Sequence, residues 1–265
     1  AISTLVYILT VEQTASFWDP GEFSAVSYKL QVPHPPGAPF MLLVYRMFGF
    51  LAMGDPLEVA YWMNIGSALF SGFTILFLFW SITLFGKRMF SITEGQESKD
   101  QTIALMGAGI VGALAYTFSD SFWYSAVEGE VYALSSFFTA LVFWAILKWE
   151  HKADQPGADK WIIFIFYMMG LSIGVHLLNI LTIPAIVMLY YFRQYKPTIT
   201  GGLFAFLVGV VITGFIQVVL IQFTIKWAGA FDVNFVNSMG LPFFSGFIFF
   251  FVFSKNIWNQ WTNTL

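Results

Sequence analysis

The stretch Val59–Phe85, VAYWMNIGSALFSGFTILFLFWSITLF, contains no charged side chain. A helix of about 20 apolar residues crosses the ~30 Å hydrocarbon core of a bilayer, so this stretch is long enough to span a membrane. The composition of the 265 residues agrees, with 58% hydrophobic, 20% aromatic and only 10% charged residues. Because soluble domains carry about 25% charged residues, a water-soluble globule is excluded.

Other apolar runs extend this pattern along the chain. The residues between Trp161 and Phe192 are too many for one crossing and few for two, so they predict a hairpin of two short helices. The sequence therefore predicts an all-α polytopic membrane bundle of about eight helices over residues 1–265. The first and last helices look truncated, which we interpret as part of a longer protein. The remaining runs are Thr102–Phe118, Val131–Leu147 and Gly201–Ile225, with partial runs at Ala1–Val11 and Pro242–Ser254.

The basic residues predict which loops face the cytoplasm. Eight of the twelve Lys and Arg residues lie in three alternate loops between residues 87 and 196, and the positive-inside rule places such loops in the cytoplasm. Pro39–Met53 must then stay outside, and Arg46 in its middle agrees, because Arg near the bilayer centre costs about 2.5–3.5 kcal/mol on insertion scales. We therefore expect an interfacial helix there, within a first extracytoplasmic loop at residues 12–58.

The outer face is acidic under this assignment. It holds nine Asp and Glu residues against three cations, Lys29, Arg46 and Lys226. An anionic lipid head group on this side would need one of these cations, although each could instead extend to lipid phosphates at the interface. The net charge of −3 argues against nucleic-acid binding, and the absence of cysteine excludes disulfides and thiolate chemistry.

The first acidic segment is WDPGE at residues 18–22. The Pro-Gly pair predicts a turn and a following helix, which puts Glu22 within one turn of Asp19. Two carboxylates beside Trp18, in a partly dry aromatic setting, suit a general base or a metal ligand. Four prolines around His34 form a rigid corner that can hold an imidazole in place. The alternative is structural, with Asp19 capping the helix and the prolines only directing the chain.

A second acidic segment lies in an outer loop between two predicted spans. Glu128 and Glu130 flank Gly129, whose flexibility lets both carboxylates point toward one site on the same side as Asp19. The alternative is a solvated turn, with the neighbouring Trp and Tyr in the aromatic belt of the membrane interface.

A third candidate is GVHLLN at residues 174–179, at the tip of the short hairpin. Its helices are a few residues short of a full span, which places the tip below the outer surface. His176 and Asn179 share a face if the turn is helical, and they could hydrogen-bond a lipid-linked phosphate or sugar. The alternative is a packed polar residue that bonds a neighbouring helix.

The order of these motifs resembles a known family. An acidic pair, then HPPGAP at residues 34–39, then an interfacial helix, is similar to the protein O-mannosyltransferases of the GT-C glycosyltransferase class. The fuller string, WDPGE at residues 18–22 with HPPGAP and the later GVHLLN, resembles more closely a related bacterial multi-pass family. The likeness spans roughly Ser16 to Pro184. Two departures are that Asp19 and Glu22 are not adjacent, and that no Leu interrupts the His-Pro-Pro-Gly stretch.

The resemblance implies a GT-C-like fold and a polyprenyl-phosphate sugar donor, with mannose as the sugar. It implies that Asp19 takes the proton of an acceptor hydroxyl as that hydroxyl attacks the anomeric carbon with inversion. A divalent cation is the one cofactor it leaves open. The residues implied to contact the substrates are Glu22, Glu128 and Glu130, toward the acceptor or the cation, and His176 and Asn179, toward the donor.

The predicted function is therefore sugar transfer at an acidic extracytoplasmic cleft, in a multi-pass protein of the bacterial inner membrane. The acceptor is a protein Ser/Thr hydroxyl or a glycolipid, and membrane lipids and a membrane complex are further expected partners. The rival function is a transporter or flippase for a lipid-linked or acidic solute. Transporters tend to place ionisable residues at mid-membrane in repeated, broken helices, whereas these charges cluster in loops. A third alternative is a non-catalytic subunit of a membrane assembly.

Overall fold

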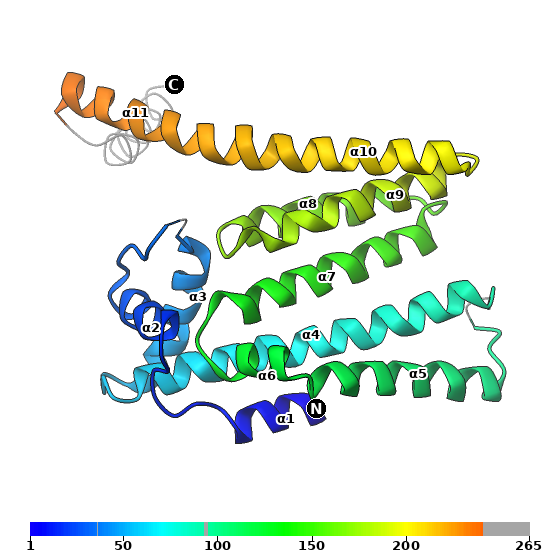
Figure 1. The fold of residues 1–265 in the computed structure, drawn as a ribbon, viewed down its shortest axis with the longest axis horizontal. Helices are drawn as coiled ribbons and strands as arrows, with labels where there is room; N and C mark the ends of the chain where they lie inside the picture. The colour runs from blue at the N-terminus through cyan, green and yellow to red at the C-terminus, as the bar shows by residue number, and fades with distance from the viewer. Residues whose placement is uncertain (36, 93–94, 241–265) are drawn as a thin grey trace, which may run out of the picture. The chain divides into compact units, whose positions relative to one another are not determined.

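The computed structural model describes residues 1–35, 37–92 and 95–240, and every regular element in them is a helix (Figure 1). This confirms the predicted all-α class. The chain divides into two compact units, Ala1–Gly209 and Val210–Leu265.

Four helical stretches among the described residues are long and apolar enough to cross a membrane, which confirms the polytopic bundle. A fifth is formed if α5 (Lys99–Thr117) and α6 (Asp120–Val127), bent by 70° at their junction, count as one span. The span predicted from Pro242 lies outside the described residues. The four stretches are α4 (Val59–Met89), α7 (Val131–Lys152), η2 (Leu177–Thr182) with α9 (Ile183–Gln194), and the continuous run of α10 (Ile199–Phe215), η3 (Ile216–Ile221) and α11 (Gln222–Met239).

The first unit is built around α4. At 1.5 Å per residue its 31 residues extend about 46 Å, beyond the ~30 Å hydrocarbon core. α5 and α7 lie along opposite sides of it (Figure 1). α5 approaches closely because it presents glycine, and a Cβ added at Gly109 would lie only 2.7 Å from the Phe79 ring. Close backbone approach of this kind stabilises helix pairs inside a bilayer.

In the chain, α6 follows α5, and a helical hairpin follows α7. α8 (Asp159–Ile173) and the η2–α9 stretch form the short hairpin predicted for Trp161–Phe192 (Figure 1). The outer loop predicted before Glu128 contains α6, which the sequence interpretation did not include. α6 forms because its buried Phe122 packs edge-on against Tyr7 of α1 (Ile2–Leu9), with the two ring centroids 6.1 Å apart.

Three short helices lie between α1 and α4. α2 (Asp19–Lys29) and α3 (Pro39–Gly49) pack on each other and on α4, and η1 (Phe50–Ala52) follows α3. α3 and η1 together occupy the predicted Pro39–Met53 helix, which is shorter than a membrane crossing needs. Their apolar side chains join those of α4 and α7 in one core, which includes Phe23, Met41, Tyr45, Met63 and Leu134.

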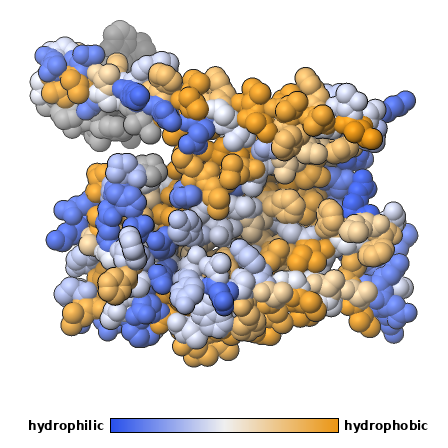
Figure 2. Space-filling view, viewed as in Figure 1, coloured by the Kyte–Doolittle hydropathy of each residue, from blue (hydrophilic) through white to orange (hydrophobic). Residues whose placement is uncertain are grey.

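Hydrophilic side chains of the first unit gather at its two ends, with hydrophobic side chains between them (Figure 2). We call residues 12–35, 37–38 and 128–130 the acidic end, where α2, α3 and the start of α7 meet. The basic end consists of residues 87–92, 95–99, 148–160 and 193–196, at the opposite ends of α4, α7 and α9 (Figure 1). The alternate loops rich in Lys and Arg thus share one end of the bundle, as predicted.

Glu150 connects three helices at the basic end. Its side chain is 9% exposed, and a carboxylate oxygen lies 3.0 Å from Arg88 Nη2 at the end of α4. Arg193, at the end of α9, donates from Nε to the backbone carbonyl of Glu150 at 3.2 Å and also pairs with Asp154. A buried carboxylate therefore compensates two arginines that come from different helices.

Replacing Glu150 by Gln should lower the melting temperature of the protein in detergent. We expect the free energy of unfolding to fall by about 1–3 kcal/mol, because the arginines lose a buried, charged acceptor. Asp154→Asn is the matched control, since that carboxylate is 84% exposed and a surface ion pair contributes only about 0–1 kcal/mol. Equal melting temperatures for the two variants would contradict a central role of Glu150.

Candidate active site

α2 begins at Asp19, directly after a strained residue. The backbone of Trp18 has a φ of 68°, in the left-handed region that residues with side chains rarely adopt. Its side chain is 90% exposed. No side-chain capping hydrogen bond is made at this helix start, and Asp19 lies within the first turn. The structural alternative of Asp19 as a helix cap is therefore wrong.

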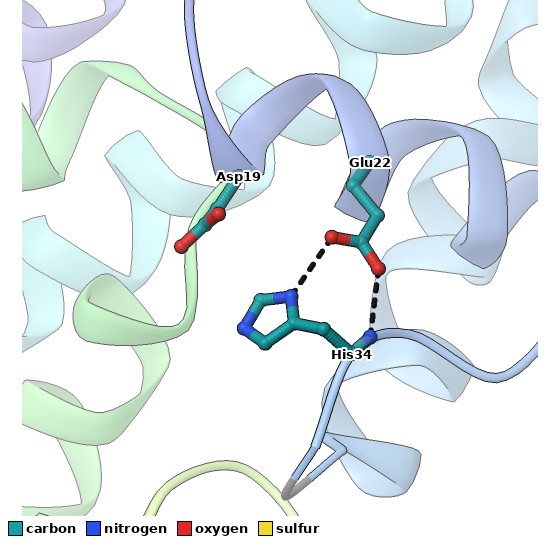
Figure 3. A group of neighbouring side chains, drawn as sticks. All are labelled: Asp19, Glu22 and His34. Carbon is teal, nitrogen blue, oxygen red and sulfur yellow. Dashed lines mark hydrogen bonds and ion pairs between the residues drawn. The ribbon is translucent and has the colours of Figure 1, made fainter.

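Glu22 holds His34 by two hydrogen bonds (Figure 3). One carboxylate oxygen accepts the backbone N–H of His34 at 2.7 Å, and the other lies 2.8 Å from the imidazole Nδ1. The hydrogen bond from His34 lowers the pKa of Glu22, and the carboxylate raises the pKa of His34. With Nδ1 donating to Glu22, Nε2 stays available on the side of the ring where Asp19 lies (Figure 3).

Asp19, Glu22 and His34 each offer one possible ligand atom, and these atoms all lie within 4.8 Å of one another. Two carboxylate oxygens and one imidazole nitrogen are ligands that a divalent transition metal accepts. The three side chains therefore have the chemistry and the proximity to share a cation.

The second acidic segment lies against the first. Gly129 is buried, and a Cβ added to it would lie 3.8 Å from Ser24 Oγ on α2 and 3.0 Å from Asn64 Oδ1 on α4. The Tyr45 hydroxyl on α3 donates to the backbone carbonyl of Glu130 at 2.9 Å. The loop between α6 and α7 is thus seated on α2, α3 and α4, which brings the two predicted acidic segments side by side.

Glu130 has the most perturbed carboxylate at this end. Burial is the largest cause, and the nearby charges of Asp19 and Glu128 add to it, so that the pKa of Glu130 rises to about 7. Its Oε2 atom is buried and makes no hydrogen bond with the described residues. At neutral pH this group is close to half protonated and can either donate or accept a hydrogen bond.

The hairpin tip reaches the same end of the bundle. The Phe40 N–H, at the start of α3, donates to the Gly174 carbonyl at 2.7 Å. The His176 ring lies 5.5 Å from the ring of Tyr132, in the first turn of α7, and its Nδ1 accepts the Leu178 N–H at 3.2 Å. His176 therefore belongs to the neighbourhood of Glu130, two residues before Tyr132.

Asn179 is placed differently from His176. His176 has extended backbone angles, so the two residues do not share the face of one helical turn. The Asn179 side chain is fully buried and donates from Nδ2 to Ser172 Oγ on α8 at 2.9 Å. Its contacts are those of a residue that packs the hairpin.

The three predicted cations have different surroundings. Lys29 is exposed at the end of α2. The Arg46 guanidinium stacks between the rings of Tyr28 and Phe50, with its carbon 4.7 and 4.6 Å from the ring centroids. In the described part of the chain no ion pair joins either cation to the acidic segments. Lys226 belongs to the second unit, where it lies over Phe223.

Two residues at this site were not singled out from the sequence. Tyr45 bonds Glu130, and Asn64 bonds Glu12 and lies against Gly129, yet each lies inside an apolar run and looks like ordinary helix interior. The available signal was the polarity of Asn64, since an amide within a membrane span requires a partner.

The fold and the site define a multi-pass helical membrane protein whose carboxylates and imidazole meet at the end opposite its Lys- and Arg-rich loops. Residues 19–199 match the family model described as Protein O-mannosyl-transferase TMEM260 N-terminal domain. This match covers more than half of the chain, and the chain belongs to that family. The resemblance drawn from residues 18–39 is thereby confirmed.

Curated relatives carry the same description. Protein O-mannosyl-transferase TMEM260 of Mus musculus is 25% identical over 192 residues, which are 72% of this chain and 24% of the relative. Protein O-mannosyl-transferase tmem260 of Dictyostelium discoideum is 23% identical over 139 residues, 52% of this chain and 15% of the relative. The chain thus spans less than a quarter of the length of either. Comparison with solved structures finds no match.

Ionisation of Glu130 should make the protein less stable as the pH rises. Its pKa is about 7 in the folded protein against 4.5 for an ordinary Glu, so between these values the folded state keeps a proton that the unfolded chain has released. The contribution of Glu130 to the free energy of unfolding is complete below pH ~4.5 and is lost as the pH rises toward ~7.

Glu130→Gln removes this titration. We expect the melting temperature of the variant, relative to wild type, to rise between pH 4.5 and 7, measured in detergent at constant ionic strength. Glu58→Gln is the control, because Glu58 is an exposed acid just before α4. A constant difference between Glu130→Gln and wild type across this range would contradict the raised pKa.

Proposed function

We propose that the chain is the catalytic membrane part of a glycosyltransferase that moves mannose from a polyprenyl-phosphate donor to an extracytoplasmic acceptor. The observation that carries the proposal is the meeting of the two acidic segments and His34 at the end opposite the basic loops. Membership in a family described as O-mannosyl-transferase supports the same chemistry. By the positive-inside rule the acidic end faces outward, in the inner membrane of a bacterium.

In the proposed step the acceptor hydroxyl attacks the anomeric carbon from the face opposite the phosphate. A bond forms between the acceptor oxygen and the anomeric carbon, and the bond from that carbon to the phosphate oxygen breaks. Polyprenyl phosphate leaves, and the hydroxyl proton passes to Asp19, with inversion at the anomeric carbon. Asp19 suits the role of general base because its carboxylate caps no helix and lies beside the imidazole of His34.

The other carboxylates have positioning roles in this proposal. Glu22 orients His34 through the pair of hydrogen bonds at 2.7 and 2.8 Å. Glu128 and Glu130 position the acceptor, or a divalent cation shared with the first segment. Glu130, with a pKa of about 7, can donate a hydrogen bond to a sugar or acceptor oxygen when it is protonated.

The donor-binding roles fall to residues around this cluster. Trp18 presents an exposed ring, and the flat faces of sugars pack well on aromatic rings of this kind. His176 contacts the donor from the hairpin tip, and Asn179 supports it by packing the hairpin. Lys29 and Arg46 are the cations of the first unit that can meet the donor phosphate on the outer side. A GT-C-like arrangement of the membrane helices is part of the same proposal.

The acceptor we propose is a Ser or Thr hydroxyl of a protein, in keeping with the description of the relatives. A glycolipid hydroxyl would act as the acceptor in the same step.

Asp19→Asn should abolish transfer while leaving the protein folded in detergent. The amide keeps the shape of the side chain and loses the basic oxygen, so sugar transfer and the release of polyprenyl phosphate should both stop. The measurement is transfer from a polyprenyl-phosphate mannose donor by the full-length protein in vesicles.

Asp120→Asn is the matched control, because Asp120 is an exposed acid at the start of α6. It should transfer at the wild-type rate. Wild-type activity in Asp19→Asn would reject Asp19 as the base. Solute flux without release of polyprenyl phosphate would favour the transporter instead.

A further inference from the structure

Asn64 is a buried amide inside an apolar helix. It lies in the second turn of α4, is 1% exposed, and belongs to the stretch Val59–Phe85 that has no charged side chain. A buried amide without partners costs about 1–3 kcal/mol. Its presence therefore requires hydrogen bonds, and these lie at the acidic end.

The amide nitrogen of Asn64 holds the segment that leads to Asp19. Nδ2 donates to the backbone carbonyl of Glu12 at 2.8 Å and to that of Thr14 at 3.0 Å. The same segment is tied to the other acidic segment, because the Glu12 N–H donates to the Val127 carbonyl at 3.1 Å, one residue before Glu128. Both hydrogens of this amide are thus used on one short piece of chain.

The amide oxygen of Asn64 faces the second acidic segment. A Cβ added at Gly129 would lie 3.0 Å from Oδ1, closer than side chains normally pack. One turn further along α4, the Ser67 hydroxyl lies 2.5 Å from the Tyr45 hydroxyl, which also donates to the Glu130 carbonyl. One side chain of a membrane helix therefore holds the chain that leads to the first acidic segment and also lies against the second. Ser67, on the same face of α4, supports the second segment through Tyr45.

We propose that Asn64 is a positioning residue that sets the separation between the first and second acidic segments, with Gly129 as the residue that makes the close contact possible. The structural part of this proposal stands on the contacts of Asn64, whereas its effect on catalysis rests on the proposed function. Asn64 touches no reacting atom, so its effect is transmitted through the backbone at residues 12–14 and 128–130.

The test is a double-mutant cycle of Asn64→Ser and Gly129→Ala. A misplacement of ~1 Å can cost about 100-fold in rate, so we expect Gly129→Ala alone to lower transfer by about 10- to 100-fold. Asn64→Ser shortens the side chain while keeping a donor, so it should make room for the new methyl group. In that background the effect of Gly129→Ala should shrink to about threefold or less.

A second readout does not depend on activity. Infrared difference spectra against pH report the protonation of Glu130, with Glu130→Gln used to assign the band. The groups that face Glu130 are Asp19, Glu128, His34 and Tyr45. Displacing the loop in Gly129→Ala changes the distance from Glu130 to Asp19 and His34, which lie on other elements, so the titration should move away from the wild-type midpoint of about 7. Asn64→Ser should move it back in the double variant.

Ser71→Ala is the matched control, because Ser71 is fully buried on α4 and its hydroxyl makes no hydrogen bond with the described residues. It should leave both readouts unchanged. Additive effects of the two substitutions, or an unmoved Glu130 titration in folded Gly129→Ala protein, would overturn the positioning role. In a third outcome, the Glu130 titration moves in Gly129→Ala and returns in the double variant, but no protein, wild type included, transfers sugar. That outcome would uphold the role of Asn64 and overturn the proposed function.

Discussion

The acidic end depends on holding like charges together against their repulsion. Asp19 and Glu128 both act on Glu130, and with burial they raise its pKa to about 7. Repulsion of this kind would spread the loops apart if the carboxylates alone decided their positions. The restraint comes from neutral groups and from one imidazole. Glu22 is hydrogen-bonded to His34, the backbone of Glu130 is bonded to α3, and the backbone of Glu12, ahead of the first segment, is bonded to α4. Protonation of Glu130 lowers the repulsion that remains between the carboxylates.

The two ends of the bundle handle charge in opposite ways. At the basic end, Glu150 is buried between Arg88 and Arg193, so each charge has a partner and the helix ends are joined. At the acidic end, no ion pair in the described residues joins an Arg or Lys to the carboxylates, and the Arg46 guanidinium stacks on aromatic rings instead. Charges that have a partner stabilise a fold, whereas carboxylates without one favour the binding of a cation or a proton. This contrast suits the acidic end to a chemical role and the basic end to a stabilising role.

The sequence predicted most of the fold, because a bilayer sets the length of every crossing helix and the run Val59–Phe85 satisfies that length without ambiguity. It also predicted that Glu22 lies within one turn of Asp19, since Pro20 and Gly21 favour a turn and a following helix. It put His34 on the same side, but it did not predict the hydrogen bonds between His34 and Glu22. It did not predict α6, or that Asn179 is buried inside the hairpin. The roles of Asn64 and Tyr45 were not foreseen either, because their partners lie 52 and 85 residues away in the sequence and no local pattern encodes such contacts.

Trp18 shows how these long-range contacts act on the site. Its left-handed backbone costs about 1–3 kcal/mol and persists only where the surroundings impose it. The exposed ring of Trp18 offers no burial to offset that cost. The constraint must come from both flanks: Asn64 holds the chain at Glu12 and Thr14, and α2 is held from the other side by its packing on α3 and α4. The turn between them has little freedom, so Asp19 enters α2 in one orientation and its carboxylate lies beside His34. Strain at Trp18 is thus the local consequence of fixing Asp19 from two directions.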